Sequence, residues 1–423
     1  MNSRERVRAA INHQSPDRVP IDLGSAPMSG IAASTYAKLR EALGLPRQPV
    51  KIGEPFQVLA VVEPEVRALL GVDTVPVMGL KNMFGFKNDG GWKPWTLFDG
   101  TETLVPGGFV TTTDEKGDLY IYAGGDASVP PSGHMPKGGY YFDAIVRQEP
   151  IDEDNLRPED WIDGQCGIFS DEDLAYLQGQ ADDLYANTDL SLNYWFGQGG
   201  LGDIAVVPGP GVKHPKGIRD QAEWYMAHML YPDYIKGIYQ MQTDIALENL
   251  KLAYQALGNK IDILGLSGTD FGTQAGPFIN PETYREFFKP HHKRLAAWIH
   301  EHTSWKVAFH TCGAITAFMD DFIEAGVDVV NPVQCSAAGM DPATLKAKWG
   351  DKLTFWGAAV DTQQVLPFGT VDEVRAQVSE RVRIFNQHGG FLAASIHNIQ
   401  QNVPVENVLA LFETLRNSAK TTA

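Results

Sequence analysis

Short apolar runs alternate with longer amphipathic segments in the second half of the chain. Five of the runs have the length and composition of buried strands, namely 261–267 (IDILGLS), 305–310 (WKVAFH), 327–332 (VDVVNP), 353–358 (LTFWGA) and 390–396 (GFLAASI). The segments between them carry helix start signals: Asn280 and Pro281 stand at N-cap and first-turn positions, and Thr370 and Glu373 have capping-box spacing. This pattern predicts repeated βα units around a parallel sheet.

The first half of the chain is less regular. We expect helices at 3–13, 29–44, 63–71, from about 170 and as a pair over 217–257, and strands at 72–78 (VDTVPVM) and 190–196 (LSLNYWF). Residues 90–142 are rich in Gly, Pro, Thr and aromatic residues, which predicts a β-rich insertion. The strand count approaches eight. The sequence therefore predicts one (β/α)8 TIM-barrel domain over residues 1–423, with an N-terminal helical extension and this insertion.

Composition excludes several classes of protein. The 423 residues carry a net charge of -17, which disfavours binding to nucleic acid and to anionic membrane surfaces. No apolar window is long enough to span a bilayer and the start of the chain has no secretory pattern, so we expect a soluble cytoplasmic protein. Its three cysteines (Cys166, Cys312 and Cys335) do not form a disulfide framework, which leaves free thiols as candidate ligands.

Polar side chains follow each of the five strands, at the barrel face where active sites lie. They are Asp270 and Gln274, His310 and Cys312, Asn331 and Gln334, Asp361 and Gln363, and His397, Asn398 and Gln400. We predict acid–base or ligand-supporting roles for Asp270 and Asp361, although each is equally suited to capping a loop or helix. Predicted substrate contacts are Gln274, Asn331, Gln334 and, from the insertion, Tyr140.

His310 and Cys312 are two residues apart at the end of a strand, where a turn directs both side chains toward one point. An imidazole and a thiolate suit Zn2+, which takes three protein ligands in catalytic sites. We predict His397 as the third ligand, with Cys335 as its rival. The alternative is a packed histidine beside an inert buried thiol.

Aromatic residues of the predicted insertion have two readings. They either cover an apolar substrate or pack in the core of a hairpin, and the same two interpretations apply to His134. Their exposure would also make a homodimer unsurprising. The residues are Trp92, Trp95, Tyr140, Tyr141 and Phe142.

Several segments resemble the uroporphyrinogen decarboxylase superfamily. They are RERVRAAINHQSPDRVP (4–20), GTDFGTQAGPFINPETYREFFKPHHKRL (268–295), FHTCGAI (309–315), DFIEAGVDVVNPVQ (321–334), LTFWGAAVDTQQVLPFGT (353–370) and HNIQQNVPVENVLALFET (397–414). Within it, the chain is similar to the branch of cobalamin-dependent methyltransferases, which implies a TIM barrel that binds Zn2+ through an H-x-C pair and a distant cysteine. His310 and Cys312 match the pair, whereas the distant position is His397 here.

The resemblance implies a zinc-dependent methyl or alkyl transferase that works with the corrinoid of a separate protein. Two histidines and one thiolate make the zinc less electron-rich than two thiolates do, which favours activation of a donor ether or thioether. One alternative is a tetrapyrrole decarboxylase, but the arginine-rich motif of that class is absent near 53–66 and no carboxylate follows Asp73 in its predicted strand. The other is a barrel that binds a tetrapyrrole or corrinoid without catalysis.

Overall fold

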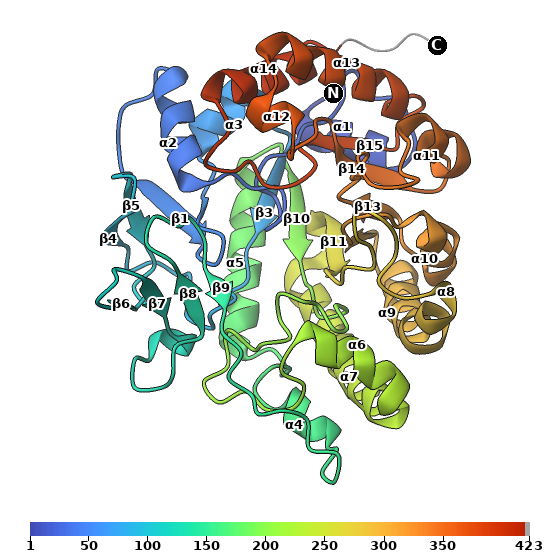
Figure 1. The fold of residues 1–423 in the computed structure, drawn as a ribbon. Coiled ribbons are helices and arrows are strands. Elements are labelled where there is room, and N and C mark those ends of the chain that lie inside the picture. Colours follow the sequence, from blue (N-terminus) through green and yellow to red (C-terminus); the bar gives the residue numbers. More distant parts are fainter. Residues whose placement is uncertain (419–423) are drawn as a thin grey trace.

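The computed structural model describes residues 1–418 and has a curled parallel sheet at its centre (Figure 1). The sheet has seven strands in the order β15-β14-β13-β12-β11-β10-β3. The strands are β3 (Thr74–Val77), β10 (Ser191–Trp195), β11 (Ile261–Ser267), β12 (Lys306–His310), β13 (Val329–Asn331), β14 (Thr354–Ala358) and β15 (Phe391–Ala394). All seven were predicted. Every residue of β11 is buried, as expected for a parallel strand covered on both faces.

An eighth segment closes the sheet into a barrel. Ile21 forms a parallel bridge with Ala393 of β15, and the N–H of Asp73, directly before β3, donates to the carbonyl of Ile21 at 2.8 Å. The residues around Ile21 therefore lie between the first and last strands of the seven-stranded sheet. The predicted TIM-barrel fold is confirmed, but the first barrel position is this short segment and β3 is the second. The absence of a carboxylate after Asp73 therefore concerns the second barrel strand, whereas the first barrel segment is followed directly by Asp22.

Helices between the strands cover the outside of the barrel (Figure 1). They are α4 (Pro158–Ile162), α5 (Asp171–Asn187), α6 (Gln221–Leu230), α7 (Pro232–Leu257), α8 (Pro281–Thr283), α9 (Lys289–His302), α10 (Met319–Ala325), α11 (Pro342–Trp349), α12 (Val365–Phe368), α13 (Val371–Phe385) and α14 (Val405–Arg416). Short 3-10 turns occur at η1 (Ala123–Gly125), η2 (Gly258–Lys260) and η4 (Thr316–Phe318). The predicted caps are present: the Asn280 side chain accepts from the N–H of Thr283, and Thr370 and Glu373 form a capping box. A π-helical turn, η3 (Tyr284–Phe288), joins α8 to α9 beside Pro290, which has no N–H to continue an α-helical ladder.

The N-terminal extension closes the amino end of the barrel. Helix α1 (Ser3–Ile11) contacts β3, β10 and β15, and its Val7 and Ile11 pack with residues inside the barrel. Arg6 and Arg18 both bind the fully buried carboxylate of Asp73, at 2.6 and 2.7 Å. Asp73 therefore anchors the extension to the start of β3, and the opposite end of the barrel remains for a functional site. The remaining N-terminal helices are α2 (Ala33–Ala42) and α3 (Pro64–Leu70).

The predicted β-rich insertion forms two small sheets beside the barrel (Figure 1). One has the order β2-β1-β5-β4 and includes β1 (Val50–Glu54) and β2 (Leu59–Ala60), which the sequence pattern did not reveal, with β4 (Lys93–Thr96) and β5 (Glu102–Val105). The other has the order β6-β7-β8-β9, formed by β6 (Thr111–Thr113), β7 (Leu119–Ile121), β8 (Gly133–Met135) and β9 (Asp143–Ala144).

The insertion aromatics fit the packing interpretation better than the roof interpretation. The Phe142 ring is fully buried, and Trp95 packs against Phe109 with ring centroids 4.9 Å apart. His134 contacts Asp118 within the hairpin at 3.0 Å. Trp92 lies beside the ammonium of Lys51 at 5.6 Å. Among residues 1–418, none of the helices has the length and hydropathy that a membrane span requires.

Candidate metal centre

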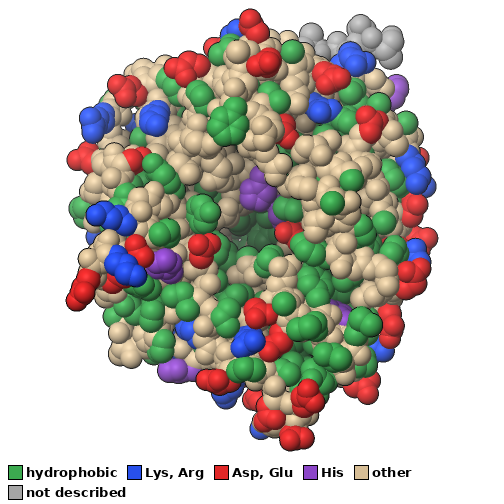
Figure 2. Space-filling model, in the orientation of Figure 1, with side chains coloured by type: hydrophobic (Ala, Val, Ile, Leu, Met, Phe, Trp, Pro, Cys, Tyr) green, Lys and Arg blue, Asp and Glu red, His purple; other side chains and the backbone are tan. Residues whose placement is uncertain are grey.

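A cavity of about 510 Å3 opens at the carboxyl ends of the barrel strands. Figure 2 looks into this hollow, with histidine at its centre and mostly apolar or uncharged side chains around it. The wall includes Trp195 of β10, His310 of β12 and residues of the loops that follow β10, β11 and β12. Polar groups on the wall are Gln57, Gln165, Gln198, Gln242, Asp203, Asp270, His310, Cys312 and His397.

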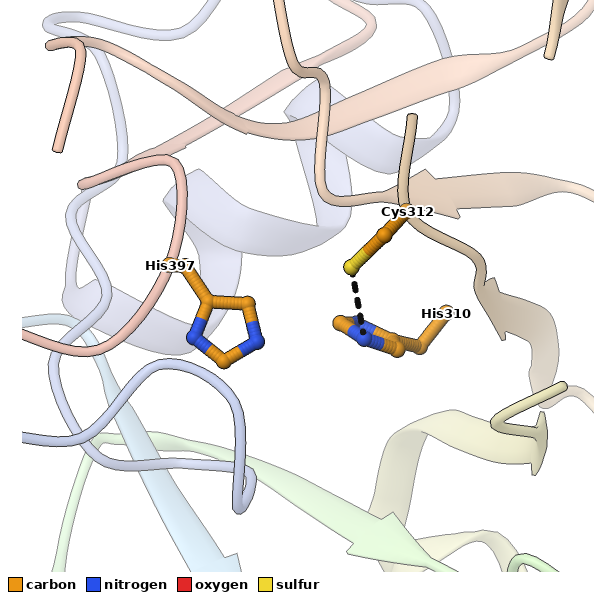
Figure 3. A group of neighbouring side chains, drawn as sticks. All are labelled: His310, Cys312 and His397. Carbon is orange, nitrogen blue, oxygen red and sulfur yellow. Dashed lines mark hydrogen bonds between the residues drawn. The ribbon is translucent and has the colours of Figure 1, made fainter. Parts of the chain in front are cut away.

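Three of the predicted residues meet on this wall. The ligand atoms of His310, Cys312 and His397 all lie within 4.8 Å of one another, and the Cys312 Sγ is 3.5 Å from His310 Nε2 (Figure 3). His310 ends β12, Cys312 lies two residues later in the turn, and His397 follows β15. The parallel barrel therefore brings His397 to the His310–Cys312 pair, although it lies 85 positions beyond Cys312 in the sequence.

A hydrogen-bond chain fixes the orientation of His310. The Nδ2 of Asn331 donates to the carbonyl of Trp356 at 3.2 Å, which leaves the Asn331 Oδ1 as an acceptor. This oxygen is 2.7 Å from His310 Nδ1, so Nδ1 carries the proton and donates it. The lone pair of His310 is therefore on Nε2, the atom beside Cys312. Metal-binding histidines are commonly oriented in this way.

His397 presents its other face to the cluster. Its Nδ1 is 2.9 Å from the backbone N–H of Asn398, whereas Nε2 faces His310 and Cys312 (Figure 3). Burial, reinforced by the nearby His310, lowers the pKa of His397 to about 3. The imidazole is thus neutral at pH 7, which is the protonation state that binds metal.

Asp270 supports the cysteine. Its Oδ1 accepts a hydrogen bond of 2.6 Å from the backbone N–H of Cys312. Burial and the Asp270 carboxylate together raise the pKa of the Cys312 thiol well above its usual range. Without a cation the thiol is therefore protonated, and a bound metal ion would supply the charge that favours the thiolate.

The structure adds Asp203, which the sequence pattern did not predict. It lies on the cavity wall in the glycine-rich loop after β10, where its Oδ1 accepts from the N–H of Ala205 at 2.9 Å. A Cβ at Gly268 would come within 2.4 Å of Asp203 Oδ2, so the glycine makes room for the carboxylate. Burial, with a smaller contribution from Asp270, raises the pKa of Asp203 to about 7. The one feature of the sequence that could have predicted a functional role for Asp203 is its position in the loop after a barrel strand.

The other predicted residues lie away from the cavity wall. Asn331 is behind His310, and Asp361 accepts the N–H groups of Gln363 and Gln364 at 3.0 and 2.6 Å, which is the loop-capping alternative. Cys335 donates to the carbonyl of Val333 instead of joining the cluster. Three more lie outside the lining of the cavity: Gln274, Gln334 and Tyr140.

The donor set suits zinc. Bond lengths of 2.0–2.3 Å in a tetrahedral site separate ligand atoms by roughly 3.3–3.6 Å. The 3.5 Å between His310 Nε2 and Cys312 Sγ already matches this range. Because the His397 nitrogen lies within 4.8 Å of both atoms, it needs to approach by at most roughly 1.5 Å. Two imidazoles and one thiol would leave a fourth position open toward the cavity.

Comparisons with known proteins agree with the fold. Residues 216–418 match the family model described as uroporphyrinogen decarboxylase (URO-D). No curated protein matches the chain. The solved structures that match include a "methyltransferase from Methanosarcina mazei", with 15% sequence identity, coverage of 98% of both chains and a TM-score of 0.55. At this identity the likeness concerns the fold. The match supports the predicted resemblance to the uroporphyrinogen decarboxylase superfamily over residues 216–418.

Proposed function

We propose that this protein is a zinc-dependent methyltransferase that transfers a methyl group between a small substrate and the corrinoid of a separate protein. The observation that carries the proposal is the His310–Cys312–His397 cluster on the wall of the cavity at the carboxyl ends of the strands. In barrels of this kind, residues at that face perform catalysis, whereas those at the opposite end stabilise the fold. The methyltransferase neighbour supports the choice of reaction within the superfamily.

The three ligands would hold zinc with one coordination position toward the cavity. Bound there, zinc supplies Lewis-acid activation of the heteroatom that carries or receives the methyl group. The chain's own residues prepare this position: Asn331 orients His310, and Asp270 holds the backbone of the Cys312 turn. The aromatic side chains of Trp195 and Phe196 also line the cavity and would exclude water from the substrate.

The cavity does not suit a tetrapyrrole decarboxylase. Uroporphyrinogen carries several carboxylates, which require positive side chains for binding. Within the described part of the chain, the cavity lining contains neither lysine nor arginine, and it includes the carboxyl groups of Asp203 and Asp270. A polyanionic substrate would therefore be repelled.

An apolar rim supports access by a partner protein. Ile204 and Val206 line the cavity and are each 42% exposed, and Phe278 is 43% exposed. Phe278 stacks on Tyr225 with ring centroids 5.6 Å apart, and the Tyr225 hydroxyl donates to the carbonyl of Asp270. Exposed apolar groups beside a cavity are typical of interaction sites. A corrinoid protein that docks here would bring its cofactor to the mouth of the cavity.

The test is methylation of Co(I) cobalamin by a panel of methyl ethers, thioethers and methylamines in the presence of zinc-loaded protein. We expect the Co(I) absorbance to decay with at least one donor. Cys312→Ala should abolish the reaction, and Cys335→Ala, a cysteine outside the cluster, should retain it. A reaction that proceeds equally in metal-free protein would contradict the proposal. Tight corrinoid binding with no transfer from any donor would instead favour the non-catalytic alternative.

A further inference from the structure

The charges in the cavity are unbalanced toward the negative. Asp203 and Asp270 place two carboxyl groups on its wall, and a metal-bound Cys312 would add a thiolate. Zn2+ compensates two of these charges. No arginine or lysine among residues 1–418 lines the cavity to compensate the third. The histidines bind metal as neutral groups. A zinc-loaded cavity with both carboxyl groups ionised therefore has room for one positive charge on the ligand.

The carboxylate of Asp203 has unused acceptor capacity. Its Oδ1 accepts the Ala205 N–H, whereas Oδ2 receives no hydrogen bond from the described residues and lies over Gly268, which also lines the cavity. An ionised carboxylate carries about four acceptor positions. Asp203 is half-buried, so its Oδ2 is accessible from the cavity but has lost part of its hydration, and a bound cation would compensate that loss. The raised pKa of Asp203, caused mainly by burial, agrees with a carboxylate that lacks a cationic partner in the free protein.

Aromatic rings complete the wall around the carboxyl groups. Phe56, Trp161, Trp195 and Phe196 line the same cavity. The Trp195 ring is 6.4 Å from that of His310, between centroids, and it lies against Gly265, where a Cβ would be 1.9 Å from the indole. The glycine in β11 thus allows the indole to lie beside the metal cluster. Aromatic faces attract organic ammonium groups, and tryptophan does so most strongly.

On these observations we propose that the methyl donor is a small organic cation of the ammonium class, bound between the carboxylates of Asp203 and Asp270 and the aromatic wall that includes Trp195. This inference rests on the proposed function, because it identifies the substrate class of the same site. The cavity of about 510 Å3 admits a quaternary ammonium together with a short substituent. Neutral methoxyarenes fill the same volume but leave the negative charge uncompensated.

Binding is measured by calorimetry on the zinc-loaded full chain with two ligands of the same shape, the cation choline and its neutral analogue 3,3-dimethyl-1-butanol. They differ by a nitrogen cation in place of a carbon, so their affinity ratio reports recognition of the charge. We expect choline to bind at least about tenfold more tightly, which is the size of a desolvated cation–aromatic contact. Asp203→Asn should reduce this ratio by about tenfold, and the control Asp372→Asn, at an exposed position of α13, should leave it unchanged.

Quenching of tryptophan fluorescence by choline, with Trp195→Leu as the comparison, provides a second readout that needs no activity. Equal affinity for the two isosteres, tighter binding of guaiacol than of choline, or an unchanged ratio in Asp203→Asn would overturn the inference. Failure of the two proposals is distinguishable. If guaiacol, a neutral methoxyarene, is demethylated by Co(I) cobalamin while choline does not bind, the transferase survives and the cationic substrate fails. If choline binds selectively while no donor methylates Co(I), the cation-binding site survives and the transferase, with the methyl-donor role of the cation, fails.

Discussion

Replacement of Asn331 by leucine should weaken zinc binding without touching a ligand. Asn331 is 1% exposed, and its Oδ1 holds the Nδ1–H of His310 at 2.7 Å. Leucine of similar size removes this acceptor, so the imidazole loses the bond that keeps the lone pair on Nε2. Loss of such a supporting contact typically lowers metal affinity about 10- to 100-fold. This corresponds to about 1.4–2.7 kcal/mol of zinc-binding free energy.

Asn331→Asp is the matched control for this change. Both variants lose the donor to the Trp356 carbonyl, which costs about 1–3 kcal/mol for an unsatisfied buried group. Only the leucine variant loses the acceptor for His310. Competition with a chromophoric chelator measures the zinc dissociation constants, and circular dichroism of the metal-free proteins checks that both fold. Equal zinc affinities for the leucine and aspartate variants would refute the role assigned to Asn331.

Three further predictions concern stability and the partner. Because the pKa of Asp203 in the folded protein lies above its value in the unfolded chain, this carboxyl group destabilises the metal-free protein increasingly as the pH rises from about 4 to 7. In scanning calorimetry, Asp203→Asn should therefore raise the thermal midpoint at pH 8 and leave it unchanged at pH 3.5. Asp73→Asn breaks the buried pairs with Arg6 and Arg18 and should lower the free energy of unfolding by about 3–5 kcal/mol in urea titrations, and a loss below about 1 kcal/mol would contradict the anchor. Phe278→Glu should slow methyl transfer with a protein-bound corrinoid at least about tenfold but not with free cobalamin, and equal slowing of both reactions would exclude a docking role.

The regular barrel strands were predictable because their burial on both faces makes them continuous apolar runs. Strand β11, with all seven residues buried, is the clearest example. The segment around Ile21 was not predictable, because a single bridge flanked by proline and glycine has neither the length of a strand nor its alternation of apolar and polar residues. The two-residue strand β2 (Leu59–Ala60) was missed for the same reason.

The site was predictable where chemistry and position coincide. His310, Cys312 and His397 carry metal-ligand atoms and follow the ends of strands, and the parallel strands place those ends at the same side of the barrel. Asn331 has the same position, yet its side chain turns behind His310 because the Trp356 carbonyl accepts its Nδ2, a contact that no local pattern encodes. Asp203 stands in a loop whose glycines suggest only a turn, and its proximity to Asp270 depends on the packing of two loops.

Zinc content of the purified protein tests the central claim most directly. The account predicts about one zinc ion per chain in wild type after zinc is supplied, and in the control His302→Ala, whose histidine is exposed on α9. Cys312→Ala and His397→Ala should each lose it while remaining folded. A wild-type protein that binds no zinc, or either variant that retains wild-type zinc content, would contradict the metal centre and the methyl-transfer mechanism built on it.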